Sequence, residues 1–305
     1  MVEGGLHSSY IANCVFNGFF SYTATMLNCV TIHAIRKTSS LLKPLKTLLL
    51  SLTVSDLGVG LLVQPMFIAY LVKKVEQATE NNPTFDNAYL ITVNLFRYAS
   101  FFGVMALSVD RFVATHLHLR YQELVTHKRV VAAVISIWVF SAFLSLIRLW
   151  TPVFIIYVVF VFIEVACIIT ATFINYKIYV VVRRHVHQIR ALQVQHAAQS
   201  VEIASAGRQK KSAIATVYVY LVFLVCYLPN ICILSTWITV KTSEPSTVIQ
   251  GLSLNTLTLV FLNSSLNPLV YCWKMRHIRH AFRNIIRSVV FKIQSDKASR
   301  KFTEN

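Results

Sequence analysis

The chain has 305 residues, of which 55% are hydrophobic and only 13% are charged, and its formal net charge is +17. An ordinary soluble domain carries about 25% charged residues, so this composition excludes a disordered chain and argues against a soluble enzyme. A basic excess is typical of nucleic-acid-binding proteins and of membrane proteins alike, so the positions of the charges decide between these classes.

Seven stretches of the sequence are nearly free of Asp, Glu, Lys and Arg. A helix needs about 20 predominantly apolar residues to span a bilayer. Hydrocarbon cannot satisfy free backbone groups, so each stretch is expected to be a helix. The sequence therefore predicts an all-α fold, a seven-transmembrane helix bundle over residues 10–273. The expected helices are at 10–35, 44–72, 87–116, 128–148, 153–182, 211–240 and 246–272.

The basic residues indicate how this bundle is oriented. Of the 29 Lys and Arg residues, 24 lie on one side of it, in 36–46, 111–129, 177–211 and 274–301. Loops rich in Lys and Arg stay in the cytoplasm, so we expect a multi-pass plasma-membrane protein with an extracellular N-terminus at 1–9 and a cytoplasmic tail at 291–305. The charge matches the anionic inner leaflet, and no basic stretch is interleaved with aromatic residues as a nucleic-acid platform would need. The bilayer is the expected partner, and nucleic acid is not.

Two cytoplasmic segments are expected to be helical as well. Residues 183–211 are basic and rich in Gln, His and Ala, which predicts that they extend the fifth helix and lead into the sixth. In residues 274–290, apolar side chains recur at helical spacing with basic side chains between them. That pattern predicts an amphipathic helix that lies on the inner leaflet.

Small polar side chains lie inside the predicted membrane helices, where each is costly and needs a reason. Asp56 is the one charged residue of 47–72. The amides and hydroxyls are Asn28, Ser100, Asn263, Ser264 and Asn267. Their oxygens suit a hard monovalent cation such as sodium, held at Asp56. A hydrogen-bonded cluster that joins the helices explains them equally well, and no other cofactor or metal is expected.

Further motifs lie toward the predicted cytoplasmic side. Asp110 and Arg111 end the third apolar stretch, Pro229 lies inside the sixth, and Pro268 lies inside the seventh, with Tyr271 one turn later. A proline inside a helix removes a backbone hydrogen bond and kinks the helix. Two kinked helices beside a polar core favour helices that pivot over a static pore.

These motifs, in this order along the chain, resemble those of the rhodopsin-like (class A) family of G-protein-coupled receptors. The residues that carry the resemblance are Asn28, the LSLTVSD segment ending at Asp56, Asp110-Arg111-Phe112, Trp138, Cys226-Tyr227-Leu228-Pro229 and Asn267-Pro268-Leu269-Val270-Tyr271. The resemblance covers about residues 10–290. It implies a non-enzymatic cell-surface receptor with a small-molecule, lipid or peptide ligand outside. It also implies outward motion of the sixth helix, a heterotrimeric G protein inside, and arrestin and receptor kinases as further partners.

The resemblance also implies roles for single residues. Those matching the sodium site and activation core are Asn28, Asp56, Ser100, Asn263, Ser264 and Asn267. Those matching the G-protein coupling switch are Asp110, Arg111 and Tyr271, and those matching the hinges are Pro229 and Pro268.

The chain also departs from the family pattern. Asp86 stands where the third helix usually carries a disulfide cysteine, and the second outer loop has only about residues 148–152. Such a loop resembles the melanocortin, adenosine and cannabinoid group. Residues 209–211 (Gln-Lys-Lys) stand where many relatives have an acidic partner for Arg111. Without that partner, we expect measurable basal signalling.

Two charged residues are expected in the outer half of the bundle. Arg97 precedes Arg111 by 14 residues, about 21 Å along a helix at 1.5 Å per residue, and Glu164 lies at a similar depth in the fifth helix. They are expected to meet as an ion pair. The pair is either a structural salt bridge, or Arg97 binds an acidic group of the ligand and pairs with Glu164 when no ligand is bound. The other candidate pocket residues are Asn94, Tyr227 and Asn230.

Two ligand classes are not expected. Val93 stands where aminergic receptors carry an aspartate, and Phe261 stands where opsins carry the lysine that binds retinal. At these two positions the sequence therefore has no carboxylate to bind an amine and no lysine to form a Schiff base with retinal. A transporter or channel that uses Asp56, Arg97 and Glu164 is the alternative function.

Overall fold

The computed structural model describes residues 2–38, 41–76, 83–117, 120–193, 200–240, 246–275, 278–284 and 287. Within these ranges the chain is almost wholly helical and contains no strand. The predicted all-α fold is therefore confirmed. For residues 185–193 and 200–211 the structure describes the helical backbone alone.

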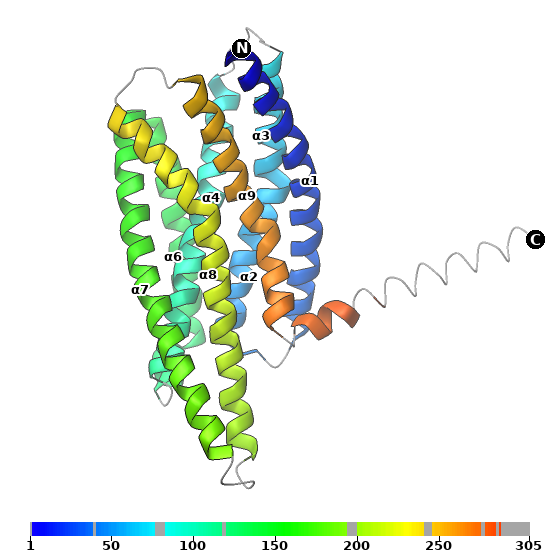
Figure 1. The fold of residues 1–305 in the computed structure, drawn as a ribbon, viewed down its shortest axis with the longest axis vertical. Helices are drawn as coiled ribbons and strands as arrows, with labels where there is room; N and C mark the ends of the chain where they lie inside the picture. The colour runs from blue at the N-terminus through cyan, green and yellow to red at the C-terminus, as the bar shows by residue number, and fades with distance from the viewer. Residues whose placement is uncertain are drawn as a thin grey trace, which may run out of the picture.

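Long helices lie side by side and run up and down the molecule (Figure 1). They are α1 (Val2–Lys37), α2 (Lys43–Gly58), α3 (Gln64–Val75), α4 (Pro83–His116), α6 (His127–Leu146), α7 (Val153–Gln193), α8 (Ser200–Val240) and α9 (Thr247–Lys274). The short elements are a π-helical turn η1 (Val59–Val63), α5 (Tyr121–Leu124) and a 3₁₀ turn η2 (Ile147–Leu149). Because η1 joins α2 directly to α3, these three elements form one rod.

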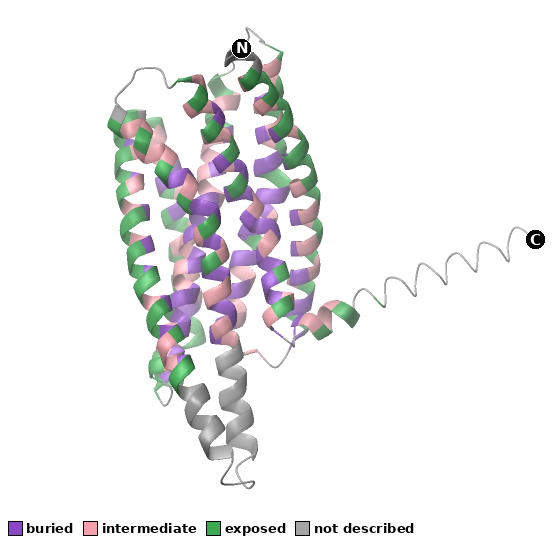
Figure 2. Ribbon diagram, in the orientation of Figure 1, coloured by how far each residue is buried: buried purple, intermediate pink, exposed green. Residues whose placement is uncertain are grey.

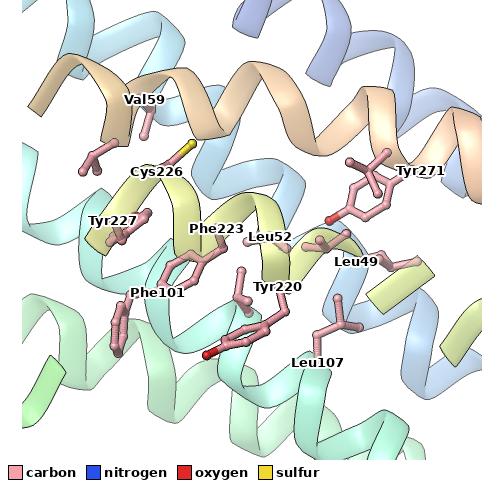
Figure 3. Close-up of a cluster of buried hydrophobic side chains, with 14 of the residues drawn as sticks. Leu49, Leu52, Val59, Phe101, Leu107, Tyr220, Phe223, Cys226, Tyr227 and Tyr271 are labelled. Atoms are coloured by element: carbon pink, nitrogen blue, oxygen red, sulfur yellow. The ribbon is translucent and has the colours of Figure 1, made fainter. Parts of the chain in front are cut away.

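The helix α4 lies at the centre of the bundle. It packs against α2, α6, α7 and α8, while α9 packs against α8 on one side and α1 on the other. Buried residues follow the inward faces of the helices and exposed residues follow the outward faces (Figure 2). Figure 3 shows the apolar centre, where Leu52, Phe101, Phe223 and Tyr227 pack between α2, α4 and α8.

Five helical segments in the described part of the chain are long and apolar enough to cross a membrane. They are Lys43–Val75, Pro83–His116, His127–Leu149, Phe154–Arg184 and Ser212–Thr239. The helices α1 and α9 fall short of that apolar criterion, and each carries several buried amides, such as Asn13 and Asn28 or Asn263 and Asn267. Five of the seven predicted membrane helices therefore meet the criterion, and the other two stay predictions.

Three helices extend beyond the apolar runs from which their bounds were predicted. The helix expected at 10–35 is Val2–Lys37, so most of the N-terminal segment 1–9 is helical. The helix expected at 153–182 runs to Gln193, and that expected at 211–240 begins at Ser200. An apolar run marks the part of a helix that suits hydrocarbon, whereas Ala, Gln, Glu and Arg continue a helix beyond it. The predicted helical extensions within 183–211 are confirmed for the described residues.

The π-helical turn η1 interrupts the rod predicted at 44–72. Pro65 lies in the first turn of α3, directly after η1. A proline ring clashes with the carbonyl four residues earlier in a regular helix, and a wider π turn relieves such a clash. Pro65 is thus the sequence signal for η1, which apolar periodicity does not indicate.

Gly60 lets α1 approach η1 closely. Ser21 Oγ donates to the Gly60 carbonyl at 2.7 Å. A Cβ atom on Gly60 would lie 2.8 Å from Thr25 Oγ1 and 3.0 Å from the Thr25 backbone nitrogen. The contact therefore depends on the missing side chain.

Replacing Gly60 by Ala is expected to lower the free energy of unfolding by about 1–3 kcal/mol, because overpacking pushes α1 away from η1. Thermal melting of the purified protein measures this. Gly18→Ala on α1 is the matched control, since nothing lies within 4 Å of a Cβ atom there, and Ala favours the helix. Equal melting temperatures for the two variants would contradict the close approach.

The predicted amphipathic helix at 274–290 is described only in part. Residues 278–284 are helical and leave the end of α9 at an angle (Figure 1). Ile278 is fully buried and Met275 is 8% exposed, so this segment is anchored against the bundle by apolar contacts. Residues 285–286, 288–290 and the predicted tail at 291–305 lie outside the described residues.

Candidate functional site

A polar cluster surrounds Asp56 in the middle of the bundle. Asp56 is wholly buried on α2, just before η1. Ser100 of α4 donates its hydroxyl to Asp56 Oδ1 at 3.3 Å, and Asn267 of α9 donates its amide to Oδ2 at 2.9 Å. Ser264 of α9 lies beside the same carboxylate. The structure thus brings together four of the six residues that the sequence predicted for this site.

The remaining two residues lie on the helices that border this cluster. Asn28 of α1 donates to the Ser264 carbonyl at 2.9 Å, so it joins α1 to α9 rather than bonding Asp56. Asn263 is wholly buried, and neither its Nδ2 nor its Oδ1 has a hydrogen-bond partner in the described part of the chain. The amide oxygens of Asn28 and Asn267 also have none there.

Buried polar atoms without partners are uncommon, and a bound ion or ordered water often explains them. A carboxylate with hydroxyl and spare amide oxygens around it has the donor chemistry of a hard-cation site. The residues therefore fit sodium by chemical type. The ion itself stays a prediction.

The coupling switch predicted at Asp110 and Arg111 forms a buried cluster at the end of α4. Arg111 is only 2% exposed. Its Nε donates to Asp110 Oδ2 at 2.8 Å, and its Nη2 forms an ion pair with the same oxygen. Its Nη1 donates to Ser212 Oγ of α8 at 3.4 Å, a long hydrogen bond. Arg111 is thus held firmly by its own helix and weakly by α8.

Sequence reasoning missed Tyr121, which lies on α5. Its hydroxyl donates to Asp110 Oδ1 at 2.8 Å and accepts from Arg111 Nη2 at 3.3 Å. Burial raises the pKa of the Tyr121 phenol above its usual value, so the group keeps the proton that it donates. A tyrosine within a basic loop carries no pattern that would mark this role.

The other residues predicted for coupling and for hinges lie within α8 and α9. Tyr271 is 1% exposed, and its hydroxyl has no hydrogen-bond partner among the described residues. Pro229 and Pro268 both lie inside their helices without ending them. In Figure 1 the upper part of α8 is inclined to its lower part, as expected for a proline inside a helix.

Arg97 of α4 and Glu164 of α7 form the ion pair that the sequence predicted. Arg97 is 8% exposed and Glu164 is 1% exposed. The contact joins Arg97 Nη2 to Glu164 Oε1, while Arg97 Nε and Glu164 Oε2 have no partner in the described part of the chain. The Arg97 guanidinium also lies 5.7 Å from the centre of the Tyr98 ring. The pair is buried, but part of its hydrogen-bonding capacity is unused.

The three other predicted pocket residues have different surroundings. Tyr227 is 2% exposed and its ring stacks on Phe223, with centroids 4.1 Å apart. Asn230 donates to Thr256 Oγ1 at 3.2 Å and so links α8 to α9. Asn94 is partly exposed on α4, one turn before Arg97. Asn94 is therefore the most accessible of the three.

A polar ladder between α1, α3 and α9 was also missed. Asn13 donates to Asn255 Oδ1 at 2.7 Å, and Thr258 donates to Asn13 Oδ1 at 2.5 Å. Asn17 donates to Thr258 Oγ1 at 2.8 Å and accepts from Gln64 Nε2 at 3.4 Å. The signal in the sequence is the pair of amides at 13 and 17, which share one helix face within a charge-free run.

Comparison with known proteins identifies the relatives of this chain. The family model described as 7 transmembrane receptor (rhodopsin family) matches residues 27–152, which contain Asn28, Asp56 and Arg111. Melanocortin receptor 5 of Pan troglodytes is 26% identical over 273 residues, which cover 87% of this chain and 81% of that receptor. Melanocortin receptor 3 of Homo sapiens is 26% identical over 274 residues, covering 85% and 80%.

Adenosine receptor A2b of Gallus gallus is 24% identical over 306 residues, which cover 87% of this chain and 85% of that receptor. The resemblance to the rhodopsin-like family, with melanocortin and adenosine receptors among the similar proteins, is therefore confirmed. Together with the apolar helices, this similarity supports a multi-pass membrane protein of the receptor class.

Proposed function

We propose that this rhodopsin-like G-protein-coupled receptor carries an extracellular chemical signal to a heterotrimeric G protein by outward motion of α8. The arrangement around Arg111 carries the proposal. Arg111 is buried, and on the described part of α8 it is held by the Ser212 hydroxyl at 3.4 Å. At 3.4 Å this hydrogen bond is longer than the usual range of about 2.7–3.2 Å, so a modest signal is enough to separate α8 from α4 and uncover Arg111.

The remainder of α8 is suited to pivot rather than to detach. Above Ser212, Tyr220 of α8 hydrogen-bonds the hydroxyl of Thr172 on α7 at 2.6 Å and the Ile168 carbonyl at 3.1 Å. Higher still, Pro229 lies inside the helix, and the upper part of α8 is inclined to its lower part (Figure 1). These contacts hold the middle of α8 while its Arg111 end is free to swing.

In this proposal the ligand binds in the half of the bundle nearer the N-terminus, beyond Tyr227. Asn94 is partly exposed there, and Arg97 and Glu164 join α4 to α7 one turn deeper. A ligand that contacts both helices therefore acts on the ion pair and, through Tyr227, on α8. The chemical class of the ligand stays open among small molecules, lipids and peptides.

In this proposal the chain crosses the plasma membrane seven times, with the N-terminus outside and the Arg111 end inside. Helical residues 278–284 then lie at the inner leaflet. Sodium at Asp56 stabilises the resting arrangement, while arrestin and receptor kinases bind the same inner face as the G protein.

Nucleotide exchange on purified Gα subunits tests the proposal. The protein in nanodiscs is expected to accelerate exchange on at least one Gα subunit, and Arg111→Gln is expected to reduce that acceleration about tenfold, as the loss of a charge-assisted contact implies. The matched control is Lys128→Gln, at an exposed position in the first turn of α6. Ion current without any exchange activity would instead support the transporter or channel.

Basal activity is expected to depend on Ser212. Ser212→Glu gives Arg111 a charged partner on α8, and such bonds contribute about 1.5–3 kcal/mol, so basal exchange should fall about tenfold. Ser212→Ala removes the existing bond and should raise basal exchange. The assay is nucleotide exchange without ligand, and a rise with Ser212→Glu would contradict the proposed restraint.

A further inference from the structure

A groove of about 660 Å³ lies between α1 and α9, away from the polar centre of the bundle. Its walls are Asn13, Phe16 and Phe20 of α1 and Asn255, Thr258 and Leu262 of α9. The two helices pack side by side along their length (Figure 1). The groove lies in the half of the helices nearer the N-terminus, because it begins at Ser8 on α1 and at Asn255 on α9.

The groove opens on the outward face of the bundle, which faces lipid in a membrane protein. Phe16 is 55% exposed and Leu259, another wall residue, is 38% exposed. Asn255 is exposed as well. An amide that faces hydrocarbon without full hydrogen bonding is costly, so Asn255 is the unusual residue of this surface.

The polar ladder fixes how Asn255 is oriented. Its Oδ1 accepts from Asn13 Nδ2 at 2.7 Å, and Asn13 is itself held by Ser9 and Thr258. With the oxygen engaged inward, the N–H groups of Asn255 are the donors that it offers to the groove. The hydrogen-bonded Asn13, Asn255 and Thr258 therefore form a polar strip at the base of the groove. The stacked rings of Phe16 and Phe20, together with Leu262, form its apolar walls.

The charge and depth of the groove select the chemistry of its occupant. Residues 4–35 and 245–273 contain no Asp, Glu, Lys or Arg, so within these ranges the two groove helices offer no Lys or Arg side chain to a phosphate headgroup. Asn255 lies eight residues into α9 after Thr247, about 12 Å from the helix end at 1.5 Å per residue. A phosphate headgroup stays at the interface, whereas a single hydroxyl or amide can reach that depth.

We propose that the α1–α9 groove binds a neutral amphiphile from the leaflet nearest the N-terminus, with its hydroxyl or amide headgroup on Asn255 and its hydrocarbon body along Phe16 and Leu262. The headgroup accepts from the Asn255 amide, which removes the cost of leaving that amide in hydrocarbon. This site is separate from the ligand position between α4 and α7, and it does not depend on G-protein coupling.

Photolabelling of the full-length protein in phosphatidylcholine nanodiscs tests the site. The probe is a fatty alcohol that carries a diazirine, with unlabelled cholesterol as competitor to show whether a sterol hydroxyl enters the same groove. Labelled peptides are expected to come from α1 and α9. Asn255→Leu should reduce that labelling about tenfold, as the loss of one buried hydrogen bond implies.

Two further variants keep the test decisive. Leu259→Trp fills the groove without touching its hydrogen bonds and should also abolish labelling, even if Asn255→Leu folds poorly. Thr170→Leu is the matched control, since Thr170 is an exposed polar residue on α7, outside the groove. Equal labelling of all three variants, or equal labelling of α1 and α9 by a diazirine-bearing phosphatidylcholine, would overturn the proposal.

Discussion

Replacing Arg97 alone by Met is expected to lower the free energy of unfolding by about 3–5 kcal/mol, the usual cost of removing one partner of a buried ion pair. Glu164 is 1% exposed, so the substitution leaves a buried carboxylate without its ion-pair partner. The double variant Arg97→Met with Glu164→Leu removes both charges, and replacing a whole buried pair by apolar residues is often neutral. The double variant should therefore recover most of the lost stability.

Thermal melting of the three proteins in the same detergent measures this result, with surface expression as a second readout. The decisive comparison is between the single and the double variant. Both lose the Arg97 contacts, but only the single variant leaves the buried Glu164 charge without its partner. A single variant that melts like wild type would contradict a structural role for the ion pair. It would favour the other interpretation, in which Arg97 is held ready for an acidic group of the ligand.

Sodium is expected to stabilise the protein, and Asp56→Asn is expected to abolish that effect. A site with sodium at a hundred times its dissociation constant adds about 2.7 kcal/mol to the free energy of unfolding. Asp56 supplies the only charge among the residues assigned to this site, with Ser100 and Asn267 bonded to its two oxygens. The Asn variant keeps the shape of the side chain but loses that charge.

Melting temperatures in sodium chloride and in choline chloride of equal ionic strength separate the bound ion from general screening. Asp86→Asn is the matched control, because Asp86 lies in the first turn of α4 near the N-terminal end of the bundle. That variant should keep the sodium response of the wild type. A wild-type protein equally stable in both salts would remove sodium and leave the hydrogen-bonded cluster as the explanation of these residues.

Most of the fold could be predicted from the sequence because the bilayer imposes one simple requirement. Charge-free runs mark the helices, and the Lys and Arg residues between them mark one side. Helices extend beyond the apolar runs where polar helix formers continue them, as at Val2. The early start at Ser200 agrees with the helical extension predicted within 183–211. The turn η1 was missed because Pro65 acts on the backbone of the preceding turn, which an apolar pattern does not report.

The residues of the candidate site could also be predicted only in part. Asp56 and Arg97 stand out because an ionisable residue in an apolar run needs a partner. The structure brings Asn267 to Asp56 and Glu164 to Arg97. Tyr121 and Asn13 were missed because tyrosines in loops and amides in helices are common, and their importance comes from distant residues brought close by packing. Such contacts join residues that are far apart in the sequence, so no repeating pattern of residue types marks them.

The account depends on two arrangements of α4 and α8, and the distance between their inner ends tests it most directly. Spin labels at His116→Cys and Ile214→Cys report that distance in nanodiscs, in a chain whose exposed Cys29 and Cys232 are replaced by Ser. Adding nucleotide-free G protein is expected to lengthen the distance between the labels, and Arg111→Gln is expected to prevent the change. An unchanged distance distribution with G protein bound would contradict the account.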